Sequence, residues 1–291
     1  MLSALYWIVI GLATGSFSLI NIFSKAVFNG KSRFVSFKSF LPVYLSLSSV
    51  FVVITTLFLV HSVYIPPNLL AYAAVTGFLY FCAAYLVFFS LDNEKASLIG
   101  TINGSQFILL SFLSALFFVP SLIFRDAAAS LIMLAGVLLL SLVSIKGLKI
   151  SKFVLLALIG NISWVVMWLF FYKTLPSNVS AFAYYSWLSI FAALFSILLS
   201  LFIRVDIKSI KYYLRTGRIF SFISLASLMN GFGTAMYSLA FTMNSAYSPL
   251  ISEISIPALI VISMIFLKER LKINQMIGAI LMIFAVVFLF L

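Results

Sequence analysis

Hydrophobic runs long enough to cross a lipid bilayer follow one another along this sequence. A helix needs roughly 20 apolar residues to cross the hydrocarbon core. The chain is 64% hydrophobic and 8% charged, whereas soluble domains are about 45–50% apolar and about 25% charged. We therefore predict an all-α integral membrane protein. Charges, prolines and polar clusters divide it into ten transmembrane helices, at residues 4–25, 38–61, 67–91, 96–118, 127–145, 152–172, 179–203, 219–242, 245–267 and 273–291.

The basic residues predict how these helices are oriented. All but two of the 18 Lys and Arg residues lie in the connections after the first, third, fifth, seventh and ninth runs, the exceptions being Arg125 and Lys173. Basic loops stay in the cytoplasm, so we expect a multi-pass protein of the cell (inner or plasma) membrane with both termini on the outer face. This distribution also explains the net charge of +12, and we expect no nucleic-acid binding. No basic residue precedes the first run, so we expect a span there and not a signal peptide.

The two halves of the sequence resemble each other in the lengths and spacings of their runs. A shift of about 150 residues lays Asn103 on Glu253 and Ser105 on Ser255. A unit of five spans ends on the side opposite its start, so two such units in tandem are inverted. We expect inverted five-helix repeats at residues 1–148 and 149–291. In transporters with this design, the binding site lies between the repeats, near the middle of the membrane.

Glu253 is the acid that lies deepest in a predicted span. An ionisable group at this depth costs several kcal/mol and usually faces a bundle interior or a wet cavity. Pro249 and Pro257 are each four residues away, on the same helical face, and prolines kink the helix and free carbonyl groups. We interpret Glu253 as a proton-coupling or cation-binding residue. The alternative is a protonated side chain that donates a structural hydrogen bond to a neighbouring helix.

Polar and aromatic residues of other spans provide further candidates for a binding site. Polar side chains are rare within apolar helices, where they either contact a ligand or hydrogen-bond between helices; both alternatives stay open here. The candidates that we expect to bind a substrate or a proton together with Glu253 are Asn21, Tyr85, Asn103, Gln106, Asn161, Trp164, Asn230 and Tyr237.

The end of the sequence resembles the EamA branch of the drug/metabolite transporter superfamily. The matching pattern is a proline in the ninth span, a Glu-Arg pair, and a Gln followed by a Gly three residues later, here Pro257, Glu269-Arg270, Gln275 and Gly278. The resemblance implies an alternating-access carrier whose central cavity is lined by spans 1, 3, 4, 6, 8 and 9, with spans 5 and 10 peripheral. The first half departs from the pattern, since it has Phe107 and Val119-Pro120 at the corresponding places.

The chemistry of these candidates bears on the solute and on alternative functions. No arginine lies in the predicted cavity, and Lys25 and Lys173 lie near span ends, so we expect a small neutral, zwitterionic or cationic metabolite such as an amino acid or amine. Multiply charged anions usually need cationic partners. The alternative is a flippase for a lipid-linked or amphiphilic envelope precursor. With one cysteine, Cys82, and one histidine, His61, we expect no enzyme, cofactor or metal site. We also expect a monomer or homodimer.

Overall fold

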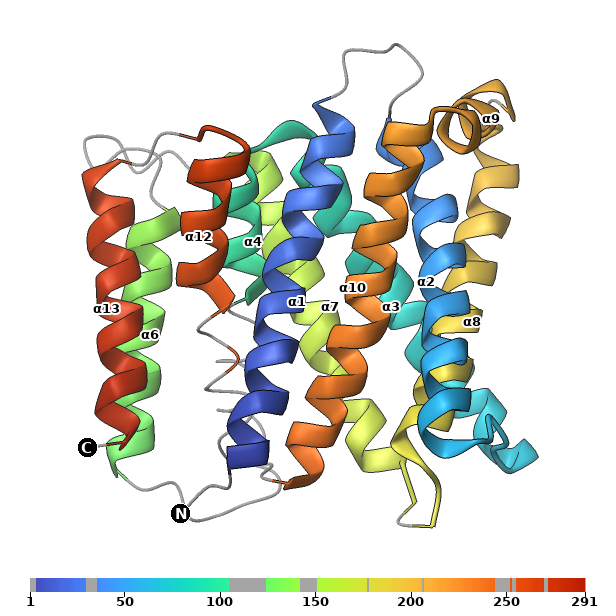
Figure 1. The fold of residues 1–291 in the computed structure, drawn as a ribbon, viewed down its shortest axis with the longest axis horizontal. Helices are drawn as coiled ribbons and strands as arrows, with labels where there is room; N and C mark the ends of the chain where they lie inside the picture. Colours follow the sequence, from blue (N-terminus) through green and yellow to red (C-terminus); the bar gives the residue numbers. More distant parts are fainter. Residues whose placement is uncertain are drawn as a thin grey trace.

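The computed structural model consists of α-helices packed side by side (Figure 1). It describes residues 4–29, 36–104, 124–141, 151–176, 178–205, 207–243, 252, 255–269 and 272–290. Every regular element in these ranges is helical, which confirms the all-α class. The helices are α1 (Ala4–Phe28), α2 (Phe37–Val60), α3 (Pro67–Asn93), α4 (Ala96–Gly104), α6 (Phe124–Ser141), α7 (Lys152–Thr174), α8 (Ala181–Phe202), α9 (Ile207–Arg215), α10 (Gly217–Met243), α12 (Ser255–Phe266) and α13 (Ile273–Phe290).

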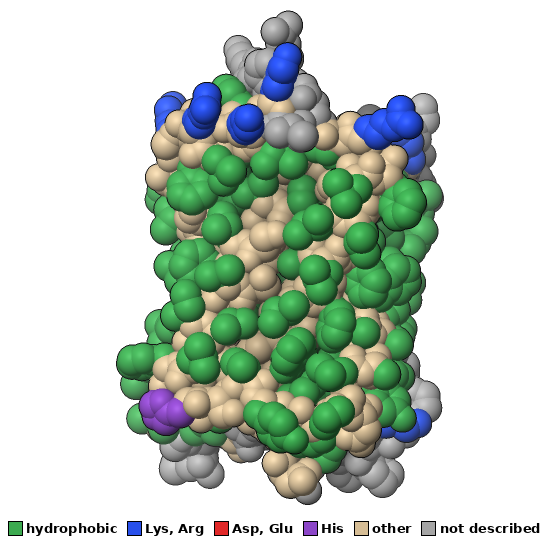
Figure 2. Space-filling view, turned by 90° about the vertical axis from the view of Figure 1, so that its right-hand side faces the viewer, with side chains coloured by type: hydrophobic (Ala, Val, Ile, Leu, Met, Phe, Trp, Pro, Cys, Tyr) green, Lys and Arg blue, Asp and Glu red, His purple; other side chains and the backbone are tan. Residues whose placement is uncertain are grey.

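Six of the described helices are long and apolar enough to cross a membrane, namely α1, α2, α3, α7, α8 and α10. Shorter apolar helices lie at Ser255–Phe266 and Met276–Ala285. Large apolar side chains form the outer surface, where Phe58 and Phe202 are 80% and 84% exposed. Figure 2 shows this apolar belt below an upper rim on which Lys and Arg side chains gather. These features establish a multi-pass membrane protein.

The helix boundaries agree with most of the predicted runs to within a few residues. The runs 96–118 and 245–267 are described only in part, as α4 and α12; the remainder of both lies outside the described residues. Local sequence explains several ends. Pro66 and Pro67 begin α3, where a missing N–H costs nothing. The hydroxyl of Ser151 accepts a hydrogen bond from the Phe153 amide at the start of α7.

The helices pack in a regular pattern of neighbours. In the main block α1 packs against α10 and α3 against α7, while α2 contacts α8 and α10, and α3 contacts α8. The pair α6 and α13 packs together at one edge of the bundle (Figure 1). Small residues allow close approach. A Cβ at Gly77 of α3 would lie 2.7 Å from the carbonyl oxygen of Leu188 in α8, and one at Gly136 would lie 2.8 Å from that of Gly278.

The two ends of the bundle differ in charge. α1 begins and α13 ends at the lower end in Figure 1, whereas α1, α3, α8 and α12 end and α2, α4, α10 and α13 begin at the upper end. The basic residues Lys38, Lys95, Arg204 and Lys268 lie at or next to these upper helix ends. We call this the basic end. The helices α1, α2 and α3 run alternately up and down, as a chain that crosses the membrane repeatedly requires.

The helix α9 lies within a segment that we expected to be a loop. It is nine residues long, too short to span a membrane, and lies across the basic end against α2 and α10. Its buried Tyr213 fixes it there: the hydroxyl accepts a hydrogen bond from the Ser36 amide and donates one to the Ser36 carbonyl, both at 3.0 Å. Burial raises the pKa of Tyr213 from 10.0 to about 12, although its hydrogen bonds to Ser39 and Ser36 lower it.

We expect Tyr213→Phe to destabilise the protein by about 1–3 kcal/mol near neutral pH, because two backbone groups of Ser36 lose their partner. The folded pKa lies above the unfolded value of 10.0. The contribution of the phenol is therefore fully present below pH 10 and is lost as the pH rises from 10 to about 12. In micelles, the free energy of unfolding of the wild type should exceed that of Tyr213→Phe at about pH 8, and most of this difference should disappear at about pH 11.5. Tyr212→Phe, on the same helix, is the control. An equal difference at both pH values would contradict the assignment.

Candidate functional site

A cavity of about 60 Å³ lies near the middle of the bundle, with room for a few water molecules. Its walls come from α1, α3, α4, α7, α10 and α12, which occupy the positions of spans 1, 3, 4, 6, 8 and 9, and also from α2 and α8. The lining residues are Phe17, Ser18, Ile20, Asn21, Tyr44, Tyr80, Val87, Phe88, Gly100, Asn103, Trp164, Trp168, Tyr185, Asn230, Thr234, Ser255 and Leu259.

Four of the predicted site residues, from four different helices, lie together in this lining: Asn21, Asn103, Trp164 and Asn230. They are far apart in the sequence, and the packing of α1, α4, α7 and α10 brings them together. Each is a polar or amphipathic side chain within an apolar helix, which was the signal that identified it.

The other predicted residues lie elsewhere. Asn161 and Tyr237 are fully buried but do not belong to the lining. Tyr85 is half-buried on α3, and its ring packs against those of Phe37 and Phe81. Pro257 is buried within α12. The predictions for Glu253, Gln106 and Pro249 lie outside the described residues.

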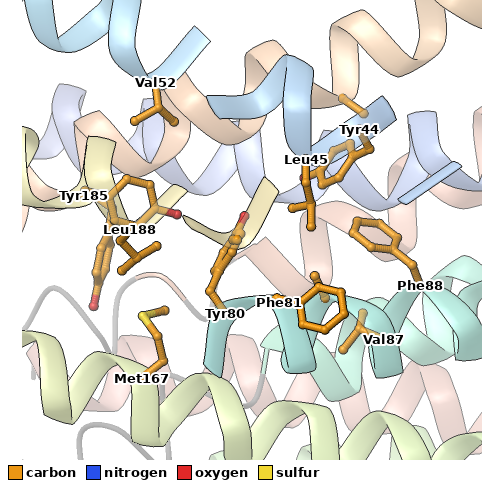
Figure 3. Packing of buried hydrophobic residues seen from close by; sticks show 14 of the residues in the cluster. Tyr44, Leu45, Val52, Tyr80, Phe81, Val87, Phe88, Met167, Tyr185 and Leu188 are labelled. Carbon is orange, nitrogen blue, oxygen red and sulfur yellow. The ribbon is translucent and has the colours of Figure 1, made fainter. Parts of the chain in front are cut away.

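A buried hydrogen-bond network fixes one wall of the cavity. The side-chain amide of Asn230 donates to the Ser48 hydroxyl and, at 2.9 Å, to the Tyr80 hydroxyl. Thr234, one turn further along α10, donates to the Tyr185 hydroxyl at 3.5 Å. Figure 3 shows Tyr80 and Tyr185 near one another, with the Tyr185 hydroxyl on the side that faces Tyr80. The network ties α10 to α2, α3 and α8, so its polar atoms have fixed positions around the cavity.

Aromatic rings form a second wall. Trp168 stacks on Tyr185 with ring centroids 6.0 Å apart and an interplanar angle of 12°. Tyr80 meets Tyr185 and Trp164 edge to face, at 6.3 and 6.0 Å. Such rings offer apolar faces to a guest and also attract cations. Tyr44 and Tyr185 were not among the predicted site residues, because aromatic residues occur throughout the apolar runs and no single-helix pattern distinguishes those that meet.

Asn103 differs from the other amides of the cavity. Its side-chain oxygen is buried and, among the described residues, has no hydrogen-bond partner. An unpaired buried acceptor costs about 1–3 kcal/mol. Asn103 therefore presents an acceptor that a water molecule or a bound solute can satisfy.

Charged groups stand outside this lining. None of the described lining residues is an Asp, Glu, Lys, Arg or His. The Lys25 ammonium donates to the carbonyl oxygens of Leu91 and Asp92, at 2.8 and 3.3 Å, and so binds the end of α3. Lys173 is exposed at the end of α7. Within the described residues, no cluster of three or more His, Cys, Asp or Glu side chains could hold a metal ion.

The hydrogen bonds of Glu269 give the acidic residue of the Glu-Arg pair a structural role. Its two carboxylate oxygens accept hydrogen bonds from the backbone amides of Ala96 and Ser97, at 2.9 and 3.1 Å. These are orphan donors of the first turn of α4, and a carboxylate there also interacts favourably with the helix dipole. In the lining of the cavity, Ser18 of α1 donates to the Ser255 carbonyl at 2.8 Å. Residues of the second half thus hold α4 and α1 of the first half.

Comparison with known proteins supports this interpretation of the sequence. Residues 151–291 match the EamA-like transporter family, which confirms the resemblance inferred from the closing segment. A crystal structure of another protein aligns over 99% of this chain and 96% of its own, with a TM-score of 0.68 and 14% sequence identity. A likeness at this identity shows that the fold is shared. Among curated proteins, no sequence matches this chain.

We expect Glu269→Ala to lower the free energy of unfolding by about 1–3 kcal/mol, because the α4 amides lose a charged acceptor. Unfolding in detergent micelles, followed by circular dichroism, measures the change. Glu94→Ala removes a carboxylate from the connection between α3 and α4 and serves as the control, with a smaller expected effect. Equal losses in the two variants would mean that general charge, and not the cap on α4, is responsible.

Proposed function

We propose that the chain is a membrane transporter of the drug/metabolite type that moves a small metabolite by alternating access; the match of residues 151–291 to the EamA-like transporter family supports this. The metabolite is neutral, zwitterionic or cationic, such as an amino acid or an amine. The observation that carries this proposal is the central cavity, in which side chains from eight helices, mostly amides and aromatic rings, surround a space without a described charged side chain.

The lining favours this class of solute over multiply charged anions. Recognition of phosphate or nucleotide groups usually employs Arg or Lys. Here the Lys25 ammonium is occupied by two carbonyl groups of α3, and Lys173 is exposed. Amides such as Asn21 and Asn103 can instead bind hydroxyl, amine or carboxyl groups, while the faces of Trp164 and Trp168 accommodate apolar or cationic parts of a solute.

We propose that residues 1–148 and 149–291 form two inverted five-helix repeats, with α1 equivalent to α7, α2 to α8, α3 to α10, α4 to α12 and α6 to α13. The helix contacts support this. The contact of α1 with α10 then corresponds to that of α7 with α3, and the contact of α2 with α10 to that of α8 with α3. Exchanging the two halves maps each of three further contacts onto itself, namely α2–α8, α4–α12 and α6–α13. A twofold relation between the halves requires such a pattern.

The two halves contribute different chemistry to the proposed site. Asn103 lines the cavity on α4, and the repeat makes it the counterpart of Glu253. Ser255 also lines the cavity, and Glu253 is two residues before it in the sequence. An amide cannot titrate whereas a carboxylate can, so we propose that Glu253 alone couples transport to a proton or cation.

Alternating access requires that contacts at one end of the cavity break while the other end closes. At the basic end, Glu269 of the second half binds the first turn of α4 in the first half. We propose that the hydrogen bonds of Glu269 form part of the closed gate at this end, and that this end faces the cytoplasm, as its lysines and arginines suggest.

Counterflow in proteoliposomes, with a panel of amino acids, amines and sugars, tests the function and identifies the solute. We expect Asn103→Ala to raise the KM of the accepted solute about 5–10-fold, the effect of losing one hydrogen bond of about 1–1.5 kcal/mol. Asn93→Ala, in an exposed asparagine at the end of α3, is the matched control and should leave KM unchanged. Absence of counterflow for every class in the panel would refute the proposed carrier, and an unchanged KM in Asn103→Ala would remove this residue from the site.

The same vesicles, with an imposed pH gradient, test coupling. We expect Glu253→Gln to retain solute exchange but to lose accumulation driven by the gradient, because the amide cannot release a proton. Glu94→Gln, which neutralises a carboxylate in the α3–α4 connection, should accumulate solute like the wild type. Gradient-driven accumulation in Glu253→Gln would show that the proton passes through another group or that transport is not coupled.

A further inference from the structure

The surface of α9 is divided into three sectors. Successive residues of a helix are separated by about 100°. Tyr213 and Ile210 face the bundle, where Tyr213 is fully buried. Leu214 comes next around the helix and is 53% exposed. The third sector is basic and exposed, and it consists of Lys208, Lys211 and Arg215.

The helix α9 lies at the basic end of the bundle, where we expect hydrocarbon to meet lipid headgroups. It follows α8, whose last residues Leu201 and Phe202 are 70% and 84% exposed and continue the apolar belt to its upper limit. The chain then turns at Arg204, which has a positive φ of 50°, and α9 lies across the end of the bundle (Figure 1). Leu214 and the basic sector therefore lie on a helix that follows the upper end of the apolar belt along the chain.

The segment around α9 is strongly positive. Residues 204–218 contain Arg204, Lys208, Lys211, Arg215 and Arg218, against the single acid Asp206. Arg218 is held over the ring of Phe222, 5.9 Å from its centroid, and this ring stacks in turn on that of Phe23. No residue of α9 belongs to the lining of the central cavity, so its basic sector has a different task from solute binding.

We propose that the basic sector of α9 (Lys208, Lys211 and Arg215) binds the phosphate headgroups of anionic phospholipids in the leaflet at the basic end. A helix with basic and apolar faces lies in the membrane interface, and each Lys or Arg near an anionic surface contributes about 1 kcal/mol. Basic residues that only orient the chain in the membrane need to be in a cytoplasmic loop, but they need no fixed position in it. Here the charges stand on a helix that Tyr213 fixes to the backbone of Ser36, so they form one face in a defined place.

An anionic lipid suits this face better than a nucleic acid or an acidic protein. The apolar sector with Leu214 borders the basic sector on α9, and α9 follows the exposed residues Leu201 and Phe202 along the chain. Only a partner that offers hydrocarbon and phosphate side by side matches that arrangement. The bilayer itself is such a partner.

Lipid binding by the full-length chain in mixed micelles tests the proposal, with native mass spectrometry counting bound phosphatidylglycerol and phosphatidylcholine. We expect the wild type to prefer phosphatidylglycerol. The triple variant Lys208→Gln, Lys211→Gln, Arg215→Gln should lose at least about tenfold in affinity for phosphatidylglycerol, and its affinity for phosphatidylcholine should stay unchanged. The control Lys152→Gln, Lys268→Gln, Lys272→Gln removes equal charge from other positions in the connections, with an expected loss below about twofold.

Two outcomes would overturn the proposal: equal losses in both triple variants, which would indicate general attraction by net charge, or no preference for phosphatidylglycerol in the wild type. A charge-preserving variant, Lys208→Arg, Lys211→Arg, Arg215→Lys, separates lipid binding from folding and should bind like the wild type. If this variant binds as weakly as the Gln variant, damage to α9 and not loss of charge is responsible, and the proposal fails. The measurement needs no transport, so its result is independent of the solute proposal above.

Discussion

Hydrocarbon offers no hydrogen-bond partner to a backbone amide or carbonyl, and this constraint underlies the whole structure. Within the bilayer each backbone group must find its partner in the protein, and helices satisfy it locally. The same constraint extends to side chains. Asn230 donates to Ser48 and Tyr80, and Ser18 donates to the Ser255 carbonyl. The described polar atoms of the interior are therefore largely committed to neighbours, and among the cavity-lining side chains the oxygen of Asn103 is buried without a described partner.

The sequence predicted the helices well and the lining of the central cavity in part, for physical reasons that differ. A long apolar run has few alternatives to a spanning helix, so the bounds of α1, α2 and α3 follow from hydropathy. The bounds of α9 did not follow from hydropathy, because this helix has only nine residues. It is stabilised by docking through Tyr213 and not by its length. Its apolar residues Ile207, Ile210 and Leu214 recur at helical spacing and could have revealed it.

The site residues divide in the same way. Asn21, Asn103 and Asn230 were predictable because an amide is costly in an apolar helix, and the residue type alone marks it. Tyr44 and Tyr185 were not, because the chain has 13 tyrosines and 32 phenylalanines. Which of these rings meet depends on contacts between distant helices. The bond between Asn230 and Tyr80, for example, joins residues 150 positions apart, and no local pattern encodes such a pair.

The hydrogen bonds of Glu269 also have a consequence for the order of assembly. The backbone amide of Ala96 donates a hydrogen bond to a carboxylate that is 173 residues further along the chain. At about 5–20 residues per second, synthesis takes roughly 10–35 s to cover that distance. During this time α4 enters the membrane without its final cap. The first turn of α4 therefore stays without this acceptor until the connection between α12 and α13 leaves the ribosome, so the last part of the chain to be made completes one of the earlier helices.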